Sequence, residues 1–555
     1  MEGEMSERQE WSIEIEGMTC DGCAAGMDRA FGELAEVVAS KTSYDEGRAT
    51  VVTEASLGGD DLKAAVEGKG YRVRAITARA SSTGEGASRE GVDYDLAIIG
   101  SGSAGVAAAI KAAESGKRVA IIEAGTLGGT CVNVGCVPSK TLIRAAEARH
   151  RAATTPFAGI ETSAAGVNFA ALIRQKDELV AELRQAKYAD VLAAYAGVTV
   201  IEGHARFAPS GELAVDGEPI RAASVLIATG SSPAIPPIEG LADTPYLTSK
   251  TAMELEALPE HLVVIGAGYV ALELGQTFRR LGSRVTVLAR SRLLSSEDPD
   301  VGDALFGFLS DEGVDIRLAT SATRVEHTDG RFSLQLRGPE GETTLDADQL
   351  LVAAGRRPNT AGLGLEEVDI ELGDSGEIRV DEHLRTTRAG VFAAGDVTGD
   401  PAFVYVAAYA GNLAGDGAIN GVGRRYDTSI VPGVTFTDPA VASVGLHEHA
   451  ARERGIDVVV SKLPMSYVPR AIAARDTRGF IKLVADRETK LLVGAQIVAP
   501  EAGELIQQAV IAMKFGIRTD QLAGLLYPYL TTAEGFKLAC QTFGKDVAKL
   551  SCCAA

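Results

Sequence analysis

The sequence predicts an α/β protein in which two parallel-sheet domains follow a small βαββαβ domain. Two stretches, "IIGSGSAG" and "VVIGAGYVA", place closely spaced glycines between an apolar strand and a helix, an arrangement typical of dinucleotide-binding sheets. Short strands and helices also alternate before residue 79, and "RASSTGEGASREGVD" joins them to the rest. At 555 residues the chain is long enough for about three to four domains.

The composition restricts the class of protein. A formal net charge of −21 disfavours non-specific binding to nucleic acid or to anionic membranes. No apolar run is long enough to insert into a membrane, and the acidic start does not have the pattern of a signal peptide. We therefore expect a cytoplasmic protein. Six of the seven cysteines fall in three close pairs, and in a reducing compartment such pairs are more often catalytic or metal-binding than structural.

Residues 10–78 have the pattern of a ferredoxin-like domain. Strands are predicted at "WSIEIEG", "VVASKTSY", "RATVVTEA" and "YRVRAITA", and helices at "CAAGMDRAFGEL" and "GDDLKAAVEGKG". Cys20 and Cys23 are expected in the loop between the first strand and the first helix, where two thiolates can bind a soft metal ion. The alternatives are a thioredoxin-like redox pair or chance. The motif "GMTCDGC" resembles that of the heavy-metal-associated domain, and residues 79–92 are predicted to be a flexible linker.

The first glycine motif follows a predicted strand at Leu96–Ile99. Its glycines allow the backbone to approach a pyrophosphate, and the helix N-terminus that follows attracts the anion. Glu123 ends the next strand and can accept hydrogen bonds from ribose hydroxyls. We therefore predict a site for FAD, or for another dinucleotide with a free 2′-hydroxyl, at Gly100, Gly102, Gly105 and Glu123.

The second glycine motif follows a predicted strand at Leu262–Ile265. Its next strand, "RVTVLAR", ends in arginine and not in an acid. Guanidinium groups can bind a 2′-phosphate that a carboxylate would repel. The alternative is that both arginines are only exposed surface residues. The charge pattern favours an NADPH site at Gly266, Gly268, Ala271, Arg290 and Arg292.

The stretch "GGTCVNVGCVPSK" (128–140) contains Cys131 and Cys136. These cysteines could be metal ligands, a structural disulfide or an electron relay. Two dinucleotide sites imply hydride transfer from a nicotinamide to a flavin, and a flavin can pass two electrons to a disulfide. A helix is predicted to continue from Cys136, so this sulfur would lie near a helix N-terminus and remain a thiolate. The electron relay is therefore the favoured interpretation.

Residues 93–555 resemble the pyridine nucleotide-disulfide oxidoreductases. The resemblance rests on both glycine motifs, on the two-cysteine stretch, and on "LIATGSSP", "AAGRRPN" and "FAAGDV". It implies a FAD domain in two parts, an NADPH domain between them, and an α+β C-terminal dimerisation domain. The two parts of the FAD domain are residues 93–245 and 356–430, the NADPH domain is 246–355, and the dimerisation domain is 431–555.

The same resemblance implies roles for individual residues. Cys136 would face the flavin, and Cys131 would be the thiol that exchanges with substrate. Lys140 and Glu273 would form an ion pair near the flavin N5, and Asp396 would bind the ribityl chain. Thr130 and Lys140 would also contribute to the cofactor site.

Near the C-terminus the sequence departs from the common pattern of the family, and this departure indicates which branch of the family it resembles. Many members of the family carry a catalytic His in an H-P-T-x-x-E motif, but here "PYLTTAEG" places Tyr529 at that position, five residues before Glu534. The chain in this respect resembles the mercuric reductases, a branch of the family. That branch has the terminal pair represented here by Cys552 and Cys553, and two active-site tyrosines, here Tyr188 and Tyr529.

This resemblance implies a homodimer that reduces Hg(II) to Hg(0) with NADPH through FAD. The partner's C-terminal segment would complete each site, and small thiols would deliver Hg(II) as thiolate adducts for exchange between cysteine pairs. Two alternatives remain: an NADPH-dependent disulfide reductase with an added metal-binding domain, and a non-enzymatic thiol buffer for metals. Cys540, on a predicted helix, is expected to be a buried structural thiol.

Overall fold

The computed structural model of the chain describes residues 8–18, 21–32, 34, 36–44, 47–54, 57–79, 92–421 and 424–550. The chain divides into two compact units, residues 1–92 and residues 93–555. In the ranges that the structure describes, no helix is both long enough and apolar enough to cross a membrane.

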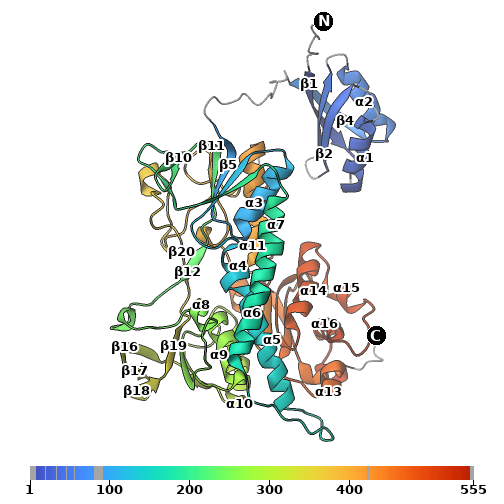
Figure 1. The fold of residues 1–555 in the computed structure, drawn as a ribbon. Coiled ribbons are helices and arrows are strands. Elements are labelled where there is room, and N and C mark those ends of the chain that lie inside the picture. Colours follow the sequence, from blue (N-terminus) through green and yellow to red (C-terminus); the bar gives the residue numbers. More distant parts are fainter. Residues whose placement is uncertain are drawn as a thin grey trace. The chain divides into compact units, whose positions relative to one another are not determined.

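The first unit is a four-stranded antiparallel sheet with two helices, which confirms the predicted βαββαβ order (Figure 1). The strands lie in the order β2-β3-β1-β4. Its core is formed by apolar residues of both helices and of strands β1 and β3, among them Ile13, Met27, Phe31 and Leu62. The elements are β1 (Arg8–Glu16), α1 (Asp21–Gly32), β2 (Val37–Ser43), β3 (Arg48–Glu54), α2 (Gly59–Gly68) and β4 (Arg72–Arg79).

The second unit begins with a five-stranded parallel sheet in the order β21-β11-β5-β6-β7. Four of its strands, β5, β6, β11 and β21, contain buried apolar runs, because helices and loops cover both faces there. The elements are β5 (Tyr94–Ile99), α3 (Ser103–Glu114), β6 (Val119–Glu123), β7 (Val198–Glu202), β11 (Ala222–Ile227), β21 (Val391–Ala393) and α11 (Val404–Asn420), with the small antiparallel strands β8 (Ala205–Phe207), β9 (Leu213–Val215) and β10 (Glu218–Ile220).

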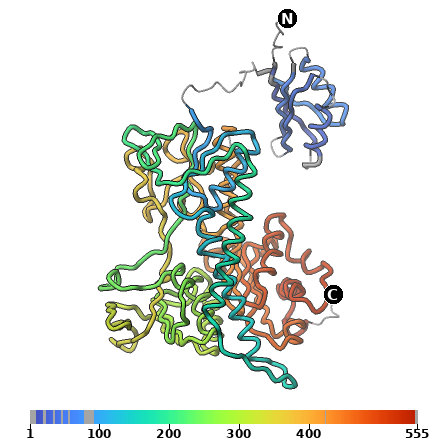
Figure 2. The backbone as a smooth tube through the Cα atoms, viewed as in Figure 1, coloured from blue at the N-terminus to red at the C-terminus, as the bar shows by residue number. Residues whose placement is uncertain are grey.

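A group of helices extends away from this sheet (Figure 2). The long helices α5 and α6 pack against each other, and α5 also packs against α9 of the next domain. A π-helical turn, η1, continues the end of α6. The elements are α4 (Gly129–Val134), α5 (Cys136–Ala153), α6 (Phe169–Arg184), η1 (Gln185–Ala189) and α7 (Asp190–Ala193).

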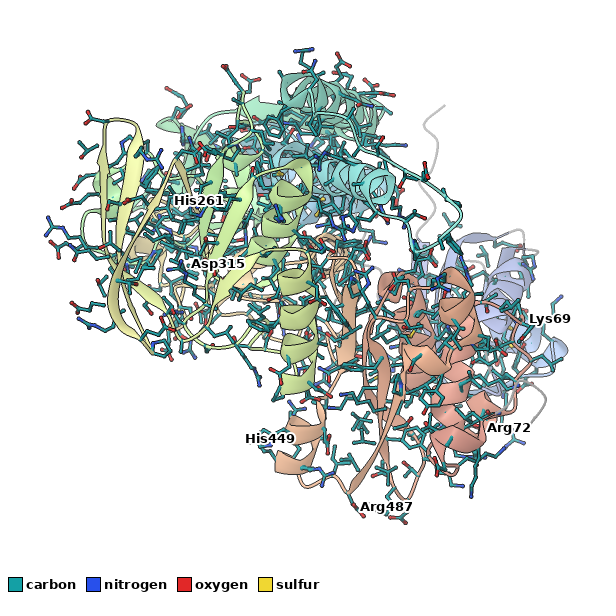
Figure 3. All side chains as sticks on the ribbon, turned by 90° about the horizontal axis from the view of Figure 1, so that it is seen from below. Lys69, Arg72, His261, Asp315, His449 and Arg487 are labelled. Atoms are coloured by element: carbon teal, nitrogen blue, oxygen red, sulfur yellow. The ribbon has the colours of Figure 1, made fainter. Side chains whose placement is uncertain are left out.

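The middle of the chain forms a second parallel sheet, in the order β15-β14-β13-β19. His261 on β13 and Asp315 on β15 each contact Thr286 on β14, at 2.9 and 3.2 Å (Figure 3). The elements are α8 (Ser249–Ala252), β13 (His261–Ile265), α9 (Tyr269–Leu281), β14 (Arg284–Leu288), α10 (Pro299–Asp311), β15 (Asp315–Arg317) and β19 (Gln349–Val352), with the antiparallel β16 (Ser321–Thr328), β17 (Arg331–Gly338) and β18 (Gly341–Ala347).

Two short strands join the parallel-sheet domains: β12 (Ser231–Pro233) pairs with β20 (Arg356–Pro358). Single 3-10 turns occur along the rest of the unit. They are η2 (Leu241–Asp243), η3 (Glu366–Val368), η4 (Asp396–Thr398), η5 (Met465–Tyr467) and η6 (Val547–Lys549).

The C-terminal part is an antiparallel sheet in the order β22-β23-β26-β25-β24, on which α14 and α16 pack. This arrangement confirms the predicted α+β class. Cys540 is buried in α16, as predicted, and burial raises the pKa of its thiol to about 12. The elements are β22 (Gly433–Thr435), β23 (Ala440–Gly445), α12 (Glu448–Glu453), β24 (Val458–Pro464), α13 (Pro469–Ala474), β25 (Phe480–Asp486), β26 (Leu492–Ala499), α14 (Ala502–Lys514), α15 (Thr519–Ala523) and α16 (Thr532–Gln541).

Candidate functional site

One cavity of about 720 Å³ brings the first glycine motif together with the cysteine pair. It lies at the C-terminal end of β5, where the sheet opens toward α4 and α5. The predicted site residues that line it are Gly100, Gly102, Glu123, Thr130, Cys131, Cys136, Lys140, Glu273 and Asp396. Residues more than 260 positions apart in the chain therefore meet in one place.

The first glycine motif forms an open cradle at the start of α3. Gly100 has φ +104°, and a Cβ there would lie 2.5 Å from the carbonyl oxygen of Ala228. Gly102 differs, because a Cβ there would meet no atom within 4 Å and would instead fill open space. That space lies at the N-terminus of α3, which attracts a phosphate group. Gly105 serves packing, because a Cβ there would lie 2.0 Å from the carbonyl oxygen of Gly100.

Glu123 is held at the edge of this cradle by backbone and side-chain donors. Its Oε2 accepts hydrogen bonds from the N–H of Ser101 at 2.9 Å and from Ser101 Oγ at 2.5 Å. Its Oε1 accepts a hydrogen bond from the N–H of Gly125 at 2.8 Å. A carboxylate fixed in this way can still accept from a ribose hydroxyl, so the residues present fit a dinucleotide with a free 2′-hydroxyl.

The second glycine motif borders an adjoining cavity of about 470 Å³. Gly266 has φ +127°, whereas a Cβ on Gly268 would meet no atom within 4 Å, so this cradle is also open at a helix N-terminus. Tyr269 and Arg356 line both cavities. Ala271 is fully buried and packs in the core beneath the motif. The residues therefore fit a second dinucleotide.

The two arginines after β14 have different surroundings. Arg290 is exposed. One terminal nitrogen of Arg292 donates to the backbone oxygens of Ser295 at 2.9 Å and of Glu297 at 2.7 Å. Arg290 is thus the more available of the two for a phosphate, a distinction that the sequence pattern does not contain.

The cysteine pair spans two helices. Cys131 lies in α4, and Cys136 is the first residue of α5. The Cys131 thiol donates a hydrogen bond to Cys136, and this bond, assisted by the Lys140 ammonium, lowers the pKa of Cys136 to about 6 against the opposing effect of burial. The same bond and burial raise the pKa of Cys131 well above its ordinary value. The pair therefore combines one thiolate with one protonated thiol near neutral pH.

Lys140 and Glu273 form the ion pair that the resemblance implies. Lys140 Nζ lies 2.7 Å from Glu273 Oε2, and the carboxylate is almost fully buried. The other oxygen, Oε1, accepts the N–H of Phe436 at 2.8 Å. The Lys140 ammonium also lies 4.6 Å from the centre of the Phe436 ring.

The two predicted tyrosines lie in different places. Tyr188 is in the π-helical turn, and a Cβ on Gly128 would lie 3.3 Å from its Cγ. Burial raises its pKa, and the charges of Cys131 and Cys136 raise it further against a hydrogen bond with Ser103. Tyr529 is 59% exposed and does not line the large cavity of its own chain. Glu534 is buried, and its Oε2 has no hydrogen-bond partner among the described residues.

The cysteines of the first unit that are predicted to bind metal are only partly described. The prediction that Cys23 lies in a loop is wrong, because α1 begins at Asp21 and Cys23 lies in its first turn. The Cys23 side chain is partly exposed. Cys20, Cys552 and Cys553 lie outside the described residues.

Several residues around the cavities were not identified from the sequence. Ser101, inside the first glycine motif, positions Glu123, and Tyr269, directly after Gly268, lines both cavities. Both positions could have been suspected from their place in a motif. Phe436 contacts Lys140 although the two residues are far apart in the sequence, and no local pattern identifies Phe436.

Three family models match the chain. Residues 94–411 match the pyridine nucleotide-disulphide oxidoreductases, and residues 431–540 match the dimerisation domain of the same family. Residues 12–72 match the heavy-metal-associated domain.

Curated relatives cover nearly the whole chain. A mercuric reductase from Staphylococcus aureus is 44% identical over 98% of this chain and 99% of its own length. One from Acidithiobacillus ferrooxidans is 45% identical over 99% of this chain and 100% of its own length. One from Streptomyces lividans is 50% identical over 83% of this chain and 98% of its own length.

Solved structures of flavoprotein reductases have the same fold as the second unit. The HOCl-induced flavoprotein disulfide reductase RclA of Escherichia coli, as a Cu(II) complex, has a TM-score of 0.73 and 33% identity over 81% of this chain and 99% of its own. LpdA of Mycobacterium tuberculosis has a TM-score of 0.71 and 30% identity over 81% of this chain and 99% of its own.

Proposed function

Because this chain belongs to the pyridine nucleotide-disulphide oxidoreductases and, within them, to the mercuric reductases, we propose that it reduces Hg(II) to Hg(0) with NADPH. The observation that carries this proposal is the Cys131–Cys136 pair, which lines one cavity together with a dinucleotide cradle. In the overall reaction NADPH loses a hydride, Hg(II) gains its two electrons, and one proton is released. We place this reaction in the cytoplasm, where thiols remain reduced.

The two cradles support FAD and NADPH as the cofactors. FAD would be held by the Gly100–Gly105 turn, by Glu123 and by Asp396, and NADPH by the Gly266–Ala271 turn and by Arg290. A bound flavin supplies two-electron transfer from the nicotinamide to the cysteine pair. The exposed Arg290 guanidinium would pair with the 2′-phosphate, which favours NADPH over NADH.

The cysteine pair supplies the ligands for Hg(II) as substrate. Cys136 is a thiolate near neutral pH, and the Cys131 thiol beside it would lose its proton on binding the metal. A soft ion prefers two such sulfur ligands and moves by exchange of one thiolate for another. Tyr188, whose pKa both sulfurs raise, would contact the bound ion.

The C-terminal domain is the proposed dimer interface. Large apolar side chains are exposed between α14 and α16, with Leu526 98% and Phe515 75% exposed, and such surfaces mark interaction sites. A homodimer through this surface would bring Tyr529 of the partner to the cysteine pair and cover the apolar side chains. The terminal Cys552 and Cys553 would take Hg(II) from small-thiol adducts, and Cys20 and Cys23 would bind Hg(II) in the first unit.

The activity is tested by comparing electron acceptors. Purified enzyme should oxidise NADPH rapidly with HgCl₂ in excess thiol, and slowly with lipoamide or oxidised glutathione. The reverse order would support the alternative, a disulfide reductase with an added metal-binding domain. Tyr529 in place of a histidine argues against that alternative, because no imidazole is present there to protonate a leaving thiol.

A further inference from the structure

The segment that enters the C-terminal domain, residues 432–438, is attached at several points to the walls of the large cavity. At its start the Tyr405 hydroxyl donates to the carbonyl oxygen of Pro432. Burial and then the Cys136 thiolate raise the pKa of Tyr405 to about 12. The segment also contacts Lys140, which lies one turn after Cys136 in α5, so it passes near the reacting sulfurs before β23 begins.

Phe436, in this segment, contacts both members of the Lys140–Glu273 ion pair. Its N–H donates to Glu273 Oε1 at 2.8 Å, and its ring faces the Lys140 ammonium at 4.6 Å. Phe436 does not line the 720 Å³ cavity; it borders a separate cavity of about 170 Å³. Any effect of Phe436 on the chemistry must therefore act through the ion pair.

The backbone on the C-terminal side of Phe436 is fixed by α9. Gln276, one turn after Glu273, accepts the N–H of Asp438 at 2.9 Å and donates to its carbonyl oxygen at 2.9 Å. Because these bonds are to the backbone, they fix the path of the chain next to Phe436. The backbone of Phe436 is therefore held between its own bond to Glu273 and these bonds from Gln276 to Asp438.

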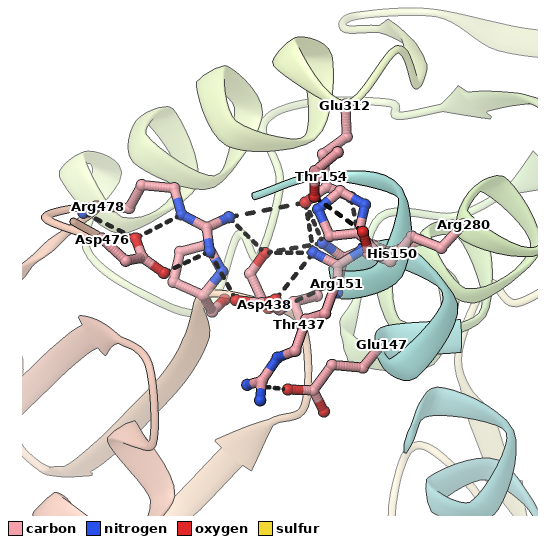
Figure 4. A network of polar contacts seen from close by, with 12 residues as sticks. Glu147, His150, Arg151, Thr154, Arg280, Glu312, Thr437, Asp438, Asp476 and Arg478 are labelled. Atoms are coloured by element: carbon pink, nitrogen blue, oxygen red, sulfur yellow. Dashed lines mark hydrogen bonds and ion pairs between the residues drawn. The ribbon is translucent and has the colours of Figure 1, made fainter. Parts of the chain in front are cut away.

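The Asp438 side chain is fixed in turn by two arginines (Figure 4). Arg280 Nη2 lies 3.0 Å from Asp438 Oδ2, and Arg478 Nη2 donates to Asp438 Oδ1 at 2.8 Å. Arg280 also pairs with Glu312 at the end of α10. This network joins the middle domain to the C-terminal domain directly beside the segment, and a buried network of this kind holds its members in one arrangement.

We propose that Phe436 is a positioning residue for the reaction, which holds the Lys140 ammonium and the Glu273 carboxylate in place beside the cysteine pair. The C-terminal domain thereby controls where the positive charge of the cavity lies. This inference rests on the proposed electron relay through Cys131 and Cys136.

The position of Lys140 matters because reduction adds negative charge beside it. When a hydride equivalent reduces a Cys131–Cys136 disulfide, the S–S bond breaks, Cys131 takes the proton and Cys136 keeps the negative charge. An ammonium close to this charge stabilises the reduced state, and the interaction weakens as the distance grows. A Lys140 that is held less closely therefore makes the enzyme harder to reduce.

The test is the two-electron midpoint potential of the purified holoenzyme, measured by equilibration with a reference dye. Phe436→Leu keeps the backbone N–H and an apolar side chain but removes the aromatic ring. The cation–π contact exists in both redox states, so its energy is an upper bound on the change: the equilibrium constant for reduction should fall by up to about fivefold, a potential up to about 20 mV more negative. Phe436→Tyr keeps the ring and should restore the native potential.

A matched control is available in the same domain. Lys462 lies 4.1 Å from the centre of the Phe480 ring, and neither residue lines the large cavity. Phe480→Leu removes the same kind of contact and should leave the potential unchanged. An unchanged potential in Phe436→Leu, an equal shift in Phe480→Leu, or no recovery in Phe436→Tyr would each overturn the proposal. The measurement uses no mercury, so it is independent of whether the same preparation reduces Hg(II).

Discussion

Lys140 Nζ and Glu273 Oε2 lie 2.7 Å apart, although the two residues are 133 positions apart in the chain. The pair joins α5, which begins with a reacting cysteine, to α9, which begins at the second glycine motif. Glu273 is almost fully buried, and a carboxylate in that position needs a cation or several donors to remain charged. One ion pair thus connects the two proposed cofactor sites and places a positive charge beside Cys136.

The hydrogen bond from Cys131 predicts a specific pH dependence. A thiol is charged when deprotonated, and the pKa of Cys136 is lowered to about 6, so the thiolate persists above that pH and is lost as the pH falls through it. The long-wavelength thiolate–flavin absorbance of the two-electron-reduced enzyme should therefore be half-lost near pH 6. Cys131→Ala removes the largest cause of the lowered pKa, so its midpoint should move to higher pH.

Two controls accompany this titration. Lys140→Met should shift the midpoint in the same direction but by less, because the charge of Lys140 is a smaller cause than the hydrogen bond. Cys136→Ala should abolish the absorbance at every pH. A midpoint that stays in place in Cys131→Ala would show that the hydrogen bond does not control the thiolate.

Arg290 should determine the preference between the two nicotinamide coenzymes. Arg290→Ala removes a charge-assisted phosphate contact, so NADPH binding should weaken about 10- to 150-fold while NADH binding is nearly unchanged. Arg292→Ala should have a smaller effect, because one of its nitrogens already binds two backbone oxygens. Dissociation constants measured by fluorescence titration test this order.

A matched control for Arg290 is Arg337→Ala. Arg337 is an exposed arginine of the same domain that pairs with Glu342 on a strand away from both cavities. Equal weakening of NADPH and NADH by Arg290→Ala would indicate that Arg290 supports the fold of the site and not phosphate recognition.

Tyr529 should act on the metal step and not on the nicotinamide step. Tyr529→Phe removes only the hydroxyl, so mercury turnover should fall about 10-fold or more, while NADPH reduces the flavin at nearly the native rate. Stopped-flow absorbance separates the two steps. Tyr467→Phe, another exposed tyrosine of the domain, should leave both rates unchanged. A parallel loss of flavin reduction in Tyr529→Phe would assign the hydroxyl to the fold.

Delivery of Hg(II) across the dimer interface can be tested with a heterodimer. One subunit carries Cys552→Ala and Cys553→Ala, and the other carries Cys131→Ala and Cys136→Ala. Delivery between subunits leaves one complete site, so about half of the native activity should remain with a bulky Hg(II)–dithiolate. Delivery within a subunit leaves no complete site. Activity no higher than that of the two mutant homodimers would exclude transfer across the interface.

Much of the fold could be predicted because its signals are local. The strand before Gly100, the strand that ends at Glu123 and the helix that begins at Cys136 are each marked by an apolar run, a glycine motif or both. The order of elements in the first unit follows from alternation over about 70 residues. In each case neighbouring residues determine the backbone, so the pattern is visible in the sequence.

The rest of the site depends on contacts that no local pattern contains. Phe436 meets Glu273 across 163 positions, and Gln276 meets Asp438 across 162. Arg290 and Arg292 look equivalent in the sequence, but the path of the chain after β14 brings two carbonyl oxygens to Arg292 alone. Packing between domains decides the contacts of Phe436 and Gln276, and the backbone path of the turn after β14 decides those of Arg292.

The most direct test of the proposed function is to collect mercury vapour while the purified enzyme oxidises NADPH with HgCl₂ and excess thiol under anaerobic conditions. The proposed reaction predicts one atom of volatile mercury for each NADPH oxidised, and no vapour from an enzyme that carries Cys131→Ala and Cys136→Ala. NADPH oxidation without volatile mercury, or vapour from the double variant at the native rate, would contradict it.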